Sequence, residues 1–295
     1  MGGRLLGGDA CQCLDRNCPG DLLASTTQVI SFTDNSEWNH QALKSLTESL
    51  ATRAVGRDIH FLDVDDSTND VARQLARAGA DDGTVVIAER QSSGRGRMNR
   101  SWHSPRGGIW ASVLFMPNAW TREPALLVLL SPAAIARATE MATGLEITIK
   151  WPNDLRTRGR KVAGILGEVE HIAGGQALIL GFGVNANIPR ADFPLALQGI
   201  ATSLMAELGR PIDMVGLLRQ VLIQLDTFYI DFNCGNLQPW LEDYRLRCDT
   251  FGNTVTVNTP SGEISGIAED IDAGGALLLR DANGNLKRIV VGDIR

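Results

Sequence analysis

The pattern of apolar and polar positions divides the chain into two kinds of segment. From residue 58 to about 248, short apolar runs typical of strands alternate with segments whose apolar residues recur every third or fourth position, as in helices. After about 249 only short alternating runs remain, separated by turns that contain glycine. The pattern predicts a larger α/β (α+β) domain over 58–248 and a small β-barrel over 249–295.

Within the larger domain, strand and helix patterns follow one another closely, and glycines at 79 and 144 mark two helix ends. The predicted strands are 59–63, 84–89, 109–116, 146–151, 162–172 and 177–187, the last two forming a hairpin. The predicted helices are 68–78, 124–143, 202–208, 213–232 and 237–246. In the C-terminal part we expect strands at 254–258, 264–269, 276–280 and 287–291.

Residues 1–57 form an N-terminal extension with a different pattern. Residues 1–20 are rich in Gly and Cys without periodicity and are expected to be disordered, while residues 36–54 have the spacing of one amphipathic helix. Cys11, Cys13 and Cys18 lack a convincing fourth metal ligand, so we expect no metal site there. The role of this cysteine segment, and whether the true start lies downstream of it, stay open.

A winged-helix DNA-binding domain would need two helices, of which one is basic and enters the major groove. Residues 1–58 show one helix pattern and contain five Lys or Arg against seven Asp or Glu. The whole chain has a net charge of −6, which argues against nucleic acid as its main partner. DNA binding is therefore not expected.

Compartment and membrane association follow from cysteine number and run length. The five cysteines are an odd number, which favours free thiols in a reducing compartment over a disulfide framework. The apolar run 125–130 ends at Ser131-Pro132, well short of the roughly 20 residues that span a bilayer. No signal peptide is evident. We expect a cytoplasmic protein that does not enter a membrane.

The segment 94–105 is the most distinctive in the chain, because Arg95, Arg97 and Arg100 alternate with glycines between two strand patterns. The planar arginine fork matches phosphate and carboxylate oxygens, and glycine lets the backbone approach a ligand closely. A solvated basic turn is the alternative. We interpret it as an arginine loop that closes over an anionic ligand such as a nucleotide. Without that ligand, mutual repulsion should leave the loop open.

Five motifs in order resemble the biotin protein ligase family. They are Ser67-Thr68-Asn69, the segment from Glu89 through Trp102-His103-Ser104-Pro105 to Gly108, Lys150-Trp151-Pro152-Asn153-Asp154, Lys161 to Leu166 with Glu168, and Gly181 to Asn187. The resemblance implies a mixed, largely antiparallel sheet with packed helices, like the class II tRNA-synthetase catalytic domain, and an SH3-like C-terminal β-barrel. It also implies formation of biotinyl-5′-AMP from biotin and ATP with Mg²⁺. Biotin then passes to a lysine of a carboxylase's biotin carboxyl carrier domain. Which carboxylase is modified, and whether the chain forms a homodimer, cannot be derived from the sequence.

The resemblance assigns site residues position by position. Ser67, Thr68 and Asn69 would bind the ureido head of biotin, although capping of the following helix would equally explain them. The biotin set is completed by Gln91, Gly94, Arg95, Gly96, Arg97, Lys161, Gly164, Gly181 and Gly183. The ATP set is Arg97, Arg100, Trp102, Asn153, Asp154, Lys161 and Asn185, with Asp154 also close to the metal. Arg97 and Lys161 would be catalytic, since fixed cations stabilise charge on phosphoryl oxygens. Taken alone, Lys161 would be an ordinary surface lysine.

Two other functions remain open at this stage. A lipoate or octanoate ligase would share the fold and the adenylation chemistry, but the complete Gly-Arg-Gly-Arg loop and the Lys150–Asp154 motif favour biotin. A bifunctional ligase and biotin-responsive repressor would bind DNA as well. One departure from the family pattern is Asn99, where a glycine is usual; asparagine tolerates a left-handed backbone better than most residues. We expect Trp110 to pack in the core and assign no catalytic role to His103.

Overall fold

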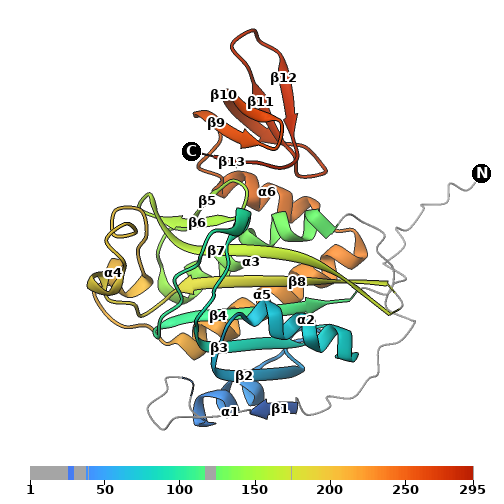
Figure 1. Cartoon of the computed structure of the whole chain (residues 1–295), viewed down its shortest axis with the longest axis vertical. Helices are drawn as coiled ribbons and strands as arrows, with labels where there is room; N and C mark the ends of the chain where they lie inside the picture. The colour runs from blue at the N-terminus through green and yellow to red at the C-terminus, as the bar shows by residue number, and fades with distance from the viewer. Residues whose placement is uncertain (1–25, 30–37, 39, 117–123, 174, 295) are drawn as a thin grey trace, which may run out of the picture.

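An eight-stranded mixed sheet forms the body of the protein (Figure 1). The computed structural model describes residues 26–29, 38, 40–116, 124–173 and 175–294. The sheet order is β1-β2-β3-β4-β8-β7-β6-β5, with β1, β2 and β3 parallel and every other pair antiparallel. The strands are β1 (Thr26–Val29), β2 (Asp58–Asp65), β3 (Val85–Gln91), β4 (Gly108–Phe115), β5 (Thr148–Lys150), β6 (Asp154–Thr157), β7 (Arg160–Ile172) and β8 (Gly175–Asn185).

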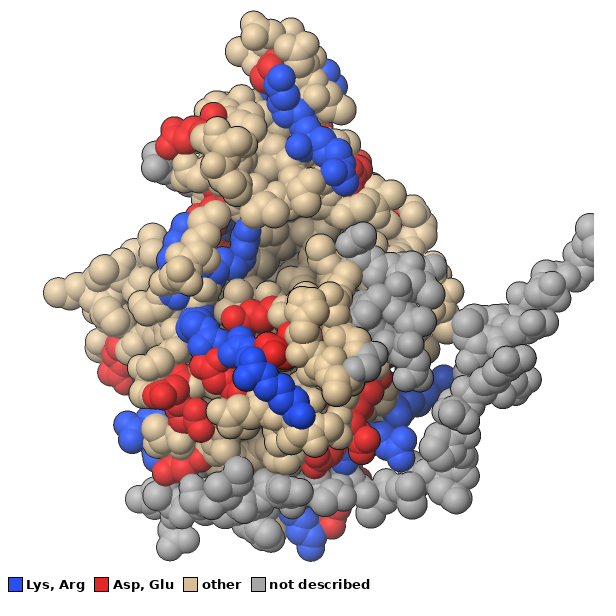
Figure 2. All heavy atoms as spheres, turned by 45° about the vertical axis from the view of Figure 1, so that its right-hand side comes forward, with Lys and Arg blue, Asp and Glu red and all other residues tan. Residues whose placement is uncertain are grey.

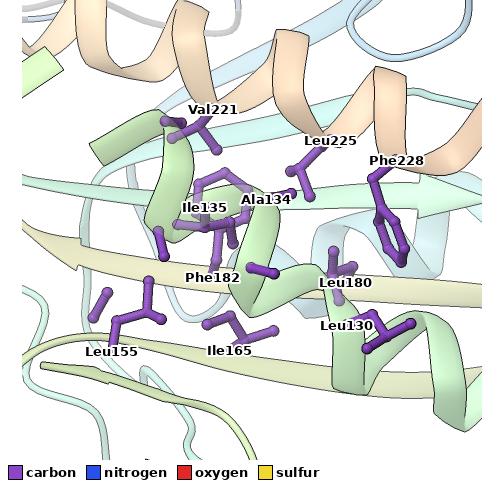
Figure 3. Packing of buried hydrophobic residues seen from close by; sticks show 14 of the residues in the cluster. Leu130, Ala134, Ile135, Leu155, Ile165, Leu180, Phe182, Val221, Leu225 and Phe228 are labelled. Carbon is purple, nitrogen blue, oxygen red and sulfur yellow. The ribbon is translucent and has the colours of Figure 1, made fainter. Parts of the chain in front are cut away.

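Helices cover both faces of this sheet. Helix α2 (Thr68–Ala78) packs on one face, and α3 (Pro124–Thr143) packs on the other beneath α5 (Met214–Cys234). Figure 3 shows this layering, with Leu130, Ala134 and Ile135 of α3 between sheet residues and residues of α5. The remaining helices are α1 (His40–Ser49), α4 (Leu204–Leu208) and α6 (Gln238–Arg247).

Strand β4 shows how the sequence pattern produces these layers. All eight of its residues are buried. Ile109, Ala111, Val113 and Phe115 belong to the core on the α3 side, whereas Leu114 packs with α2 on the opposite side, because successive strand side chains point to opposite faces. Ser112, also fully buried, is the polar exception on the α2 face.

Helix α3 is long and apolar enough to cross a membrane by length and composition alone. Of the most apolar 18-residue stretch of this helix, 67% is buried inside the protein. Its neighbours are α5, α6 and strands of the sheet. The helix is a core element, as its apolar run and Pro132 predicted.

The C-terminal residues form a separate five-stranded antiparallel sheet at one end of the body (Figure 1). Its order is β12-β11-β10-β9-β13, so the described strands leave two edges and do not close into a barrel. The strands are β9 (Thr254–Thr259), β10 (Gly262–Ile271), β11 (Leu277–Arg280), β12 (Leu286–Ile289) and β13 (Asp293–Ile294). The two sheets are joined by Lys150, whose Nζ donates to the carbonyl oxygen of Ile294 at 2.7 Å.

The element predictions are confirmed apart from the following differences. The short strand β13 was missed, and the described C-terminal strands form an open sheet rather than the expected barrel. A strand was missed at β6: Pro152 ends β5, but Asp154 begins a new strand that pairs with β7. The N-terminal helix is shorter than predicted, covering 40–49, and β1 extends the sheet beside β2. Ser67 precedes α2 as expected, yet its side chain makes no capping hydrogen bond. The predictions about Cys11, Cys13 and Cys18 concern residues outside those described.

Candidate functional site

A cleft of about 360 Å³ lies between the arginine loop, the start of α2 and strands β6, β7 and β8. Of the predicted site residues, all but Gly94 line it. They are Ser67, Thr68, Asn69, Gln91, Arg95, Gly96, Arg97, Arg100, Trp102, Asn153, Asp154, Lys161, Gly164, Gly181, Gly183 and Asn185. Gly94 lies behind Gln91, where an added Cβ would come 2.6 Å from Ser104 Oγ. The structure thus brings together residues from six segments of the chain.

Small polar groups, buried except for the partly exposed Gln91, meet at the α2 end of the cleft. Thr68 Oγ1 donates to Gln91 Oε1 at 3.2 Å, and Gln91 Nε2 donates to Ser104 Oγ at 2.9 Å. Ser112 Oγ lies 2.7 Å from Thr68 Oγ1 and 2.6 Å from Asn69 Oδ1, and can donate its one hydrogen to either. The Ser67 hydroxyl makes no hydrogen bond to a described residue that would compete with a ligand.

Three glycines of β7 and β8, Gly164, Gly181 and Gly183, make room for side chains of the cleft. At Gly181 a Cβ would come 2.1 Å from Asn69 Oδ1. At Gly183 it would come 2.5 Å from Trp102 Nε1, and at Gly164 it would come 3.0 Å from the same indole. The Trp102 Nε1 atom is buried, with no hydrogen-bond partner among the described residues. Trp102 therefore lies across two glycines on the floor of the cleft.

Every arginine of the loop is held by an acceptor, so the expectation of an open, self-repelling loop is wrong. Arg95 pairs with Asp70 and Glu168. Arg97 donates from Nη1 to Asn153 Oδ1 at 3.1 Å and from Nη2 to the carbonyl oxygen of Gly292 at 2.7 Å. Arg100 pairs with Asp293. Carboxylates and carbonyls on α2, β7 and the C-terminal sheet neutralise or hydrogen-bond the three guanidinium groups, which is why repulsion does not open the loop.

Hydrogen bonding and burial shift the pKa values of several charged groups in and beside the cleft. Hydrogen bonding to Arg95 holds the pKa of Asp70 below its usual value, although partial burial opposes this. Burial lowers the pKa of Arg97, and burial also lowers the pKa of Lys150 at the cleft edge. Partly desolvated cations gain most from an anionic partner, because the local dielectric constant is low.

The turn of the loop has an unusual backbone. Met98 has φ 55° and Asn99 has φ 57°, so two successive residues without glycine's freedom lie in the left-handed region. Asn99 is thus found in the conformation expected of it. Met98 in this region was not predicted, since nothing in a methionine signals it.

Lys161 extends from β7 toward the cleft. Its Nζ lies 2.6 Å from Asp154 Oδ1 and 4.8 Å from the centroid of the Trp102 ring. Its backbone bonds to Ile200 and Thr202, which anchor the 186–203 segment over the site. Asn185 donates to the carbonyl oxygen of Thr202 at 2.9 Å, so its amide also positions this segment.

Several residues that line the cleft, or that contact its lining as Ser112 does, were missed by sequence reasoning. Ser112 had a readable signal, a hydroxyl in an otherwise apolar strand. Lys150 was part of a motif but was given no role, and Arg156 and Asp293 had no signal, because their approach depends on the β5–β6 hairpin and on the C-terminal sheet. The apolar wall comes from Phe193, Leu197, Ile200 and Ala201. Trp110 is fully buried beside Ile188 and Phe193, which confirms its core role.

Oxygen donors for a hard cation are sparse in the described part of the cleft. Among the described residues, no group of three or more His, Cys, Asp or Glu is placed to hold a metal ion. The cleft has the carboxylates of Asp154 and Asp293. One or two carboxylates, completed by water and substrate phosphates, are the usual setting for Mg²⁺.

Two family models match the chain. Residues 61–185 match the Biotin/lipoate A/B protein ligase family, and residues 250–295 match the Biotin protein ligase C terminal domain.

Relatives and solved structures agree with these models. The Bifunctional ligase/repressor BirA of Bacillus spizizenii is 37% identical over 83% of this chain and 76% of its own length. The biotin–acetyl-CoA-carboxylase ligase of Mycobacterium tuberculosis is 34% identical over 85% of this chain and 94% of its own. The structure of the Aquifex aeolicus biotin protein ligase in complex with biotin and ATP superposes with a TM-score of 0.70. It has 27% identity, over 80% of this chain and 97% of that one.

Proposed function

The chain belongs to the biotin protein ligase family and is a biotin ligase; we propose that it makes biotinyl-5′-AMP from biotin and ATP and transfers the biotin to a carrier-domain lysine. The observation that supports this most is the cleft itself. It combines a small neutral polar end at Ser67, Thr68 and Asn69 with a cationic end at Arg97 and Lys161. Biotinyl-5′-AMP has the matching arrangement: a neutral polar ureido group at one end and an anionic phosphate toward the other.

The polar end suits the ureido head of biotin. That head offers two N–H donors and one carbonyl acceptor, so hydroxyl and amide groups complement it. The Ser67 hydroxyl makes no hydrogen bond to a described residue, and Asn69 Oδ1 has a lone pair beyond the one facing Ser112. The apolar wall around Phe193 and Leu197 would face the rest of the biotin chain. Gln91 Oε1 accepts a hydrogen bond from the backbone N–H of Thr68, and Gly94 leaves room for the Gln91 side chain.

The cationic end suits the attack of the biotin carboxylate on the α-phosphate of ATP. Lys161 is a point charge that can bridge the carboxylate and the phosphate, and Arg97 can form a fork on phosphoryl oxygens. Arg100, Trp102, Asn153 and Asn185 line the same region and would hold the nucleotide. Mg²⁺ bound with ATP would be held through Asp154 and would neutralise phosphate charge.

Retention of the intermediate explains why the loop is tied down on both sides. A mixed anhydride of biotin and AMP hydrolyses and acylates amines, so it must be kept from water and from bystander lysines. Arg97 links the loop to Asn153 and to Gly292 of the C-terminal sheet. The loop and this sheet together would form the cover of the adenylate.

Other features remain part of the proposal. The acceptor would be the biotin carboxyl carrier domain of a biotin-dependent carboxylase, and the compartment the cytoplasm. We propose a division into residues 1–57, 58–248 and 249–295. In this division the middle part is the catalytic domain, similar to that of class II tRNA synthetases, and the last is SH3-like. Figure 2 shows acidic and basic side chains interspersed on one face, which suits a protein partner better than a nucleic acid.

The exchange of labelled pyrophosphate into ATP, measured with different carboxylic acids as substrate, tests the proposal. Biotin should support exchange, whereas lipoate and octanoate at equal concentration should not. If lipoate or octanoate supported exchange and biotin did not, the substrate would be one of those acids and not biotin. The Bacillus relative's name also includes repressor activity. A DNA retardation assay with the upstream region of biotin-synthesis genes decides whether this chain shares it, and we expect no retarded band.

A further inference from the structure

Glu168 connects the polar end of the cleft with the arginine loop. Its Oε2 on β7 accepts from Asn69 Nδ2 at 2.6 Å and from Arg95 Nη2 at 3.2 Å. Arg73 of α2 makes a third contact, with 3.2 Å between its Nη2 and the same oxygen. One carboxylate thus holds an amide beside the biotin head and a guanidinium of the loop.

The contact with Glu168 decides which way the Asn69 amide faces. An ionised carboxylate only accepts, so it requires the NH₂ end of Asn69. The opposite end, Oδ1, then faces the Ser112 hydroxyl at 2.6 Å. Gly181 completes the arrangement, because any side chain there would collide with Asn69 Oδ1. Rotation of the amide by half a turn would bring two oxygens together at Glu168.

The same carboxylate contributes to anchoring of the loop. Arg95 is shared between Asp70, which directly follows Asn69, and Glu168. These two carboxylates lie on different elements, α2 and β7, so Arg95 ties the loop to both walls of the cleft. A change at Glu168 therefore reaches the amide and the loop together.

A neighbouring glutamate, whose side chain is no more exposed than that of Glu168, serves as the comparison. Glu170 lies two residues further along β7, so its side chain is on the same face. It pairs with Arg73 and Arg77, and no contact joins it to Asn69 or Arg95 among the described residues. Glu168 and Glu170 share a strand, a charge and Arg73, and differ in the contacts that matter.

We propose that Glu168 is a positioning residue for biotin recognition: it fixes the orientation of the Asn69 amide and couples it to the arginine loop through Arg95. The proposal rests on the function above, because it takes biotin as the ligand beside Asn69. It assigns Glu168 no contact with the substrate.

A double-mutant cycle on biotin binding tests this, using calorimetry on the full chain without ATP. Glu168→Gln is nearly isosteric at a partly exposed position and replaces charge-assisted hydrogen bonds to Asn69 and Arg95 by neutral ones, so it should raise the Kd for biotin about tenfold. Glu170→Gln removes the same charge and should change it less than about twofold. In an Asn69→Ala background, the effect of Glu168→Gln on Kd should shrink to the part that passes through Arg95, because the part that passes through Asn69 is absent.

Cleavage of the ligand-free loop by trypsin is the second readout. Glu168→Gln should speed cleavage after Arg97 or Arg100 several-fold relative to Glu170→Gln. Equal Kd values for the two glutamine variants would overturn the inference, as would a Glu168→Gln effect that persists fully without Asn69. Absence of biotin binding by the unsubstituted chain would instead overturn the proposed function, and the inference with it.

Discussion

The Lys161 ammonium forms an ion pair with Asp154, with 2.6 Å between Nζ and Oδ1. Both side chains are about a quarter to a third exposed and line the cleft. The pair has a consequence for catalysis. In the proposed reaction a phosphate in the cleft would compete with Asp154 for the ammonium, and Asp154 would be the residue available to hold Mg²⁺.

Replacement of Lys161 by alanine should impair adenylate formation more than biotin binding. The charge matters most when the biotin carboxylate and the phosphate meet, so the loss falls on the chemical step. Removal of one such stabilising group costs on the order of 3 kcal/mol, or about a hundredfold in rate. Pyrophosphate exchange measures it, with Lys44→Ala on exposed α1 as the control. Unchanged exchange in Lys161→Ala would remove this residue from the mechanism.

Replacement of Arg97 by alanine should produce a leaky enzyme. The substitution removes the contacts to Asn153 and Gly292 as well as the fork for phosphate, so the cover over the adenylate loosens. Some biotinyl-adenylate should still form and escape to lysines of bystander proteins. Serum albumin incubated with the variant, biotin and ATP should become biotinylated on a blot. Unlabelled albumin together with a normal rate on the carrier domain would rule out the retention role.

Gly181→Ala should weaken biotin binding through Asn69. The added methyl would lie 2.1 Å from Asn69 Oδ1, and both groups are held by buried structure. Displacement of this amide removes one or more hydrogen bonds of about 1 kcal/mol each, so a Kd increase of tenfold or more is expected. Gly199→Ala is the matched control, because no atom lies within 4 Å of its added methyl. Calorimetry with biotin compares the two, and equal affinities would contradict the role given to Gly181.

Sequence reasoning reached most of the cleft because its residues occur in compact motifs. Ser67-Thr68-Asn69 and the Gly-Arg alternation carry their chemistry in adjacent positions, and the structure brings these motifs together. What it missed depends on distant pairing. Asp293 reaches Arg100 across 193 positions, and strand β6 forms by pairing with β7 after a proline that signals an end. The loop's closed state was mispredicted for the same reason, since Asp70, Glu168 and Asp293 come from three separate elements.

The backbone of the loop should be sensitive to residue 99. Asn99 has φ 57°, a conformation that β-branched residues adopt only with strain. Asn99→Val should cost about 1–2 kcal/mol in the closed loop, weakening adenylate retention about five- to thirtyfold. Asn99→Gly should retain or improve it. Dissociation of biotinyl-adenylate, followed by filter binding, measures both, and equal rates for the two variants would show that this conformation is not needed.

The Asp70–Arg95 pair should contribute to the decrease of the unfolding free energy at acidic pH. The pKa of Asp70 is lowered from 3.8 in the folded protein, so the folded state keeps this carboxylate ionised where the unfolded chain binds a proton. The contribution is therefore present above about pH 4 and is lost as pH falls through the folded pKa. Arg95→Met should flatten the fall of unfolding free energy over this range, unlike Arg210→Met at an exposed site. Urea unfolding at several pH values measures the slopes; identical slopes would contradict the pairing.

The intact mass of a biotin carboxyl carrier domain, after incubation with this protein, biotin, ATP and Mg²⁺, tests the central claim most directly. The account predicts an increase by one biotin less one water. The increase should need ATP and should disappear when the target lysine of the carrier is replaced by arginine. An unchanged carrier mass under conditions in which the protein binds biotin would contradict the claim that this cleft is the active site of a biotin ligase.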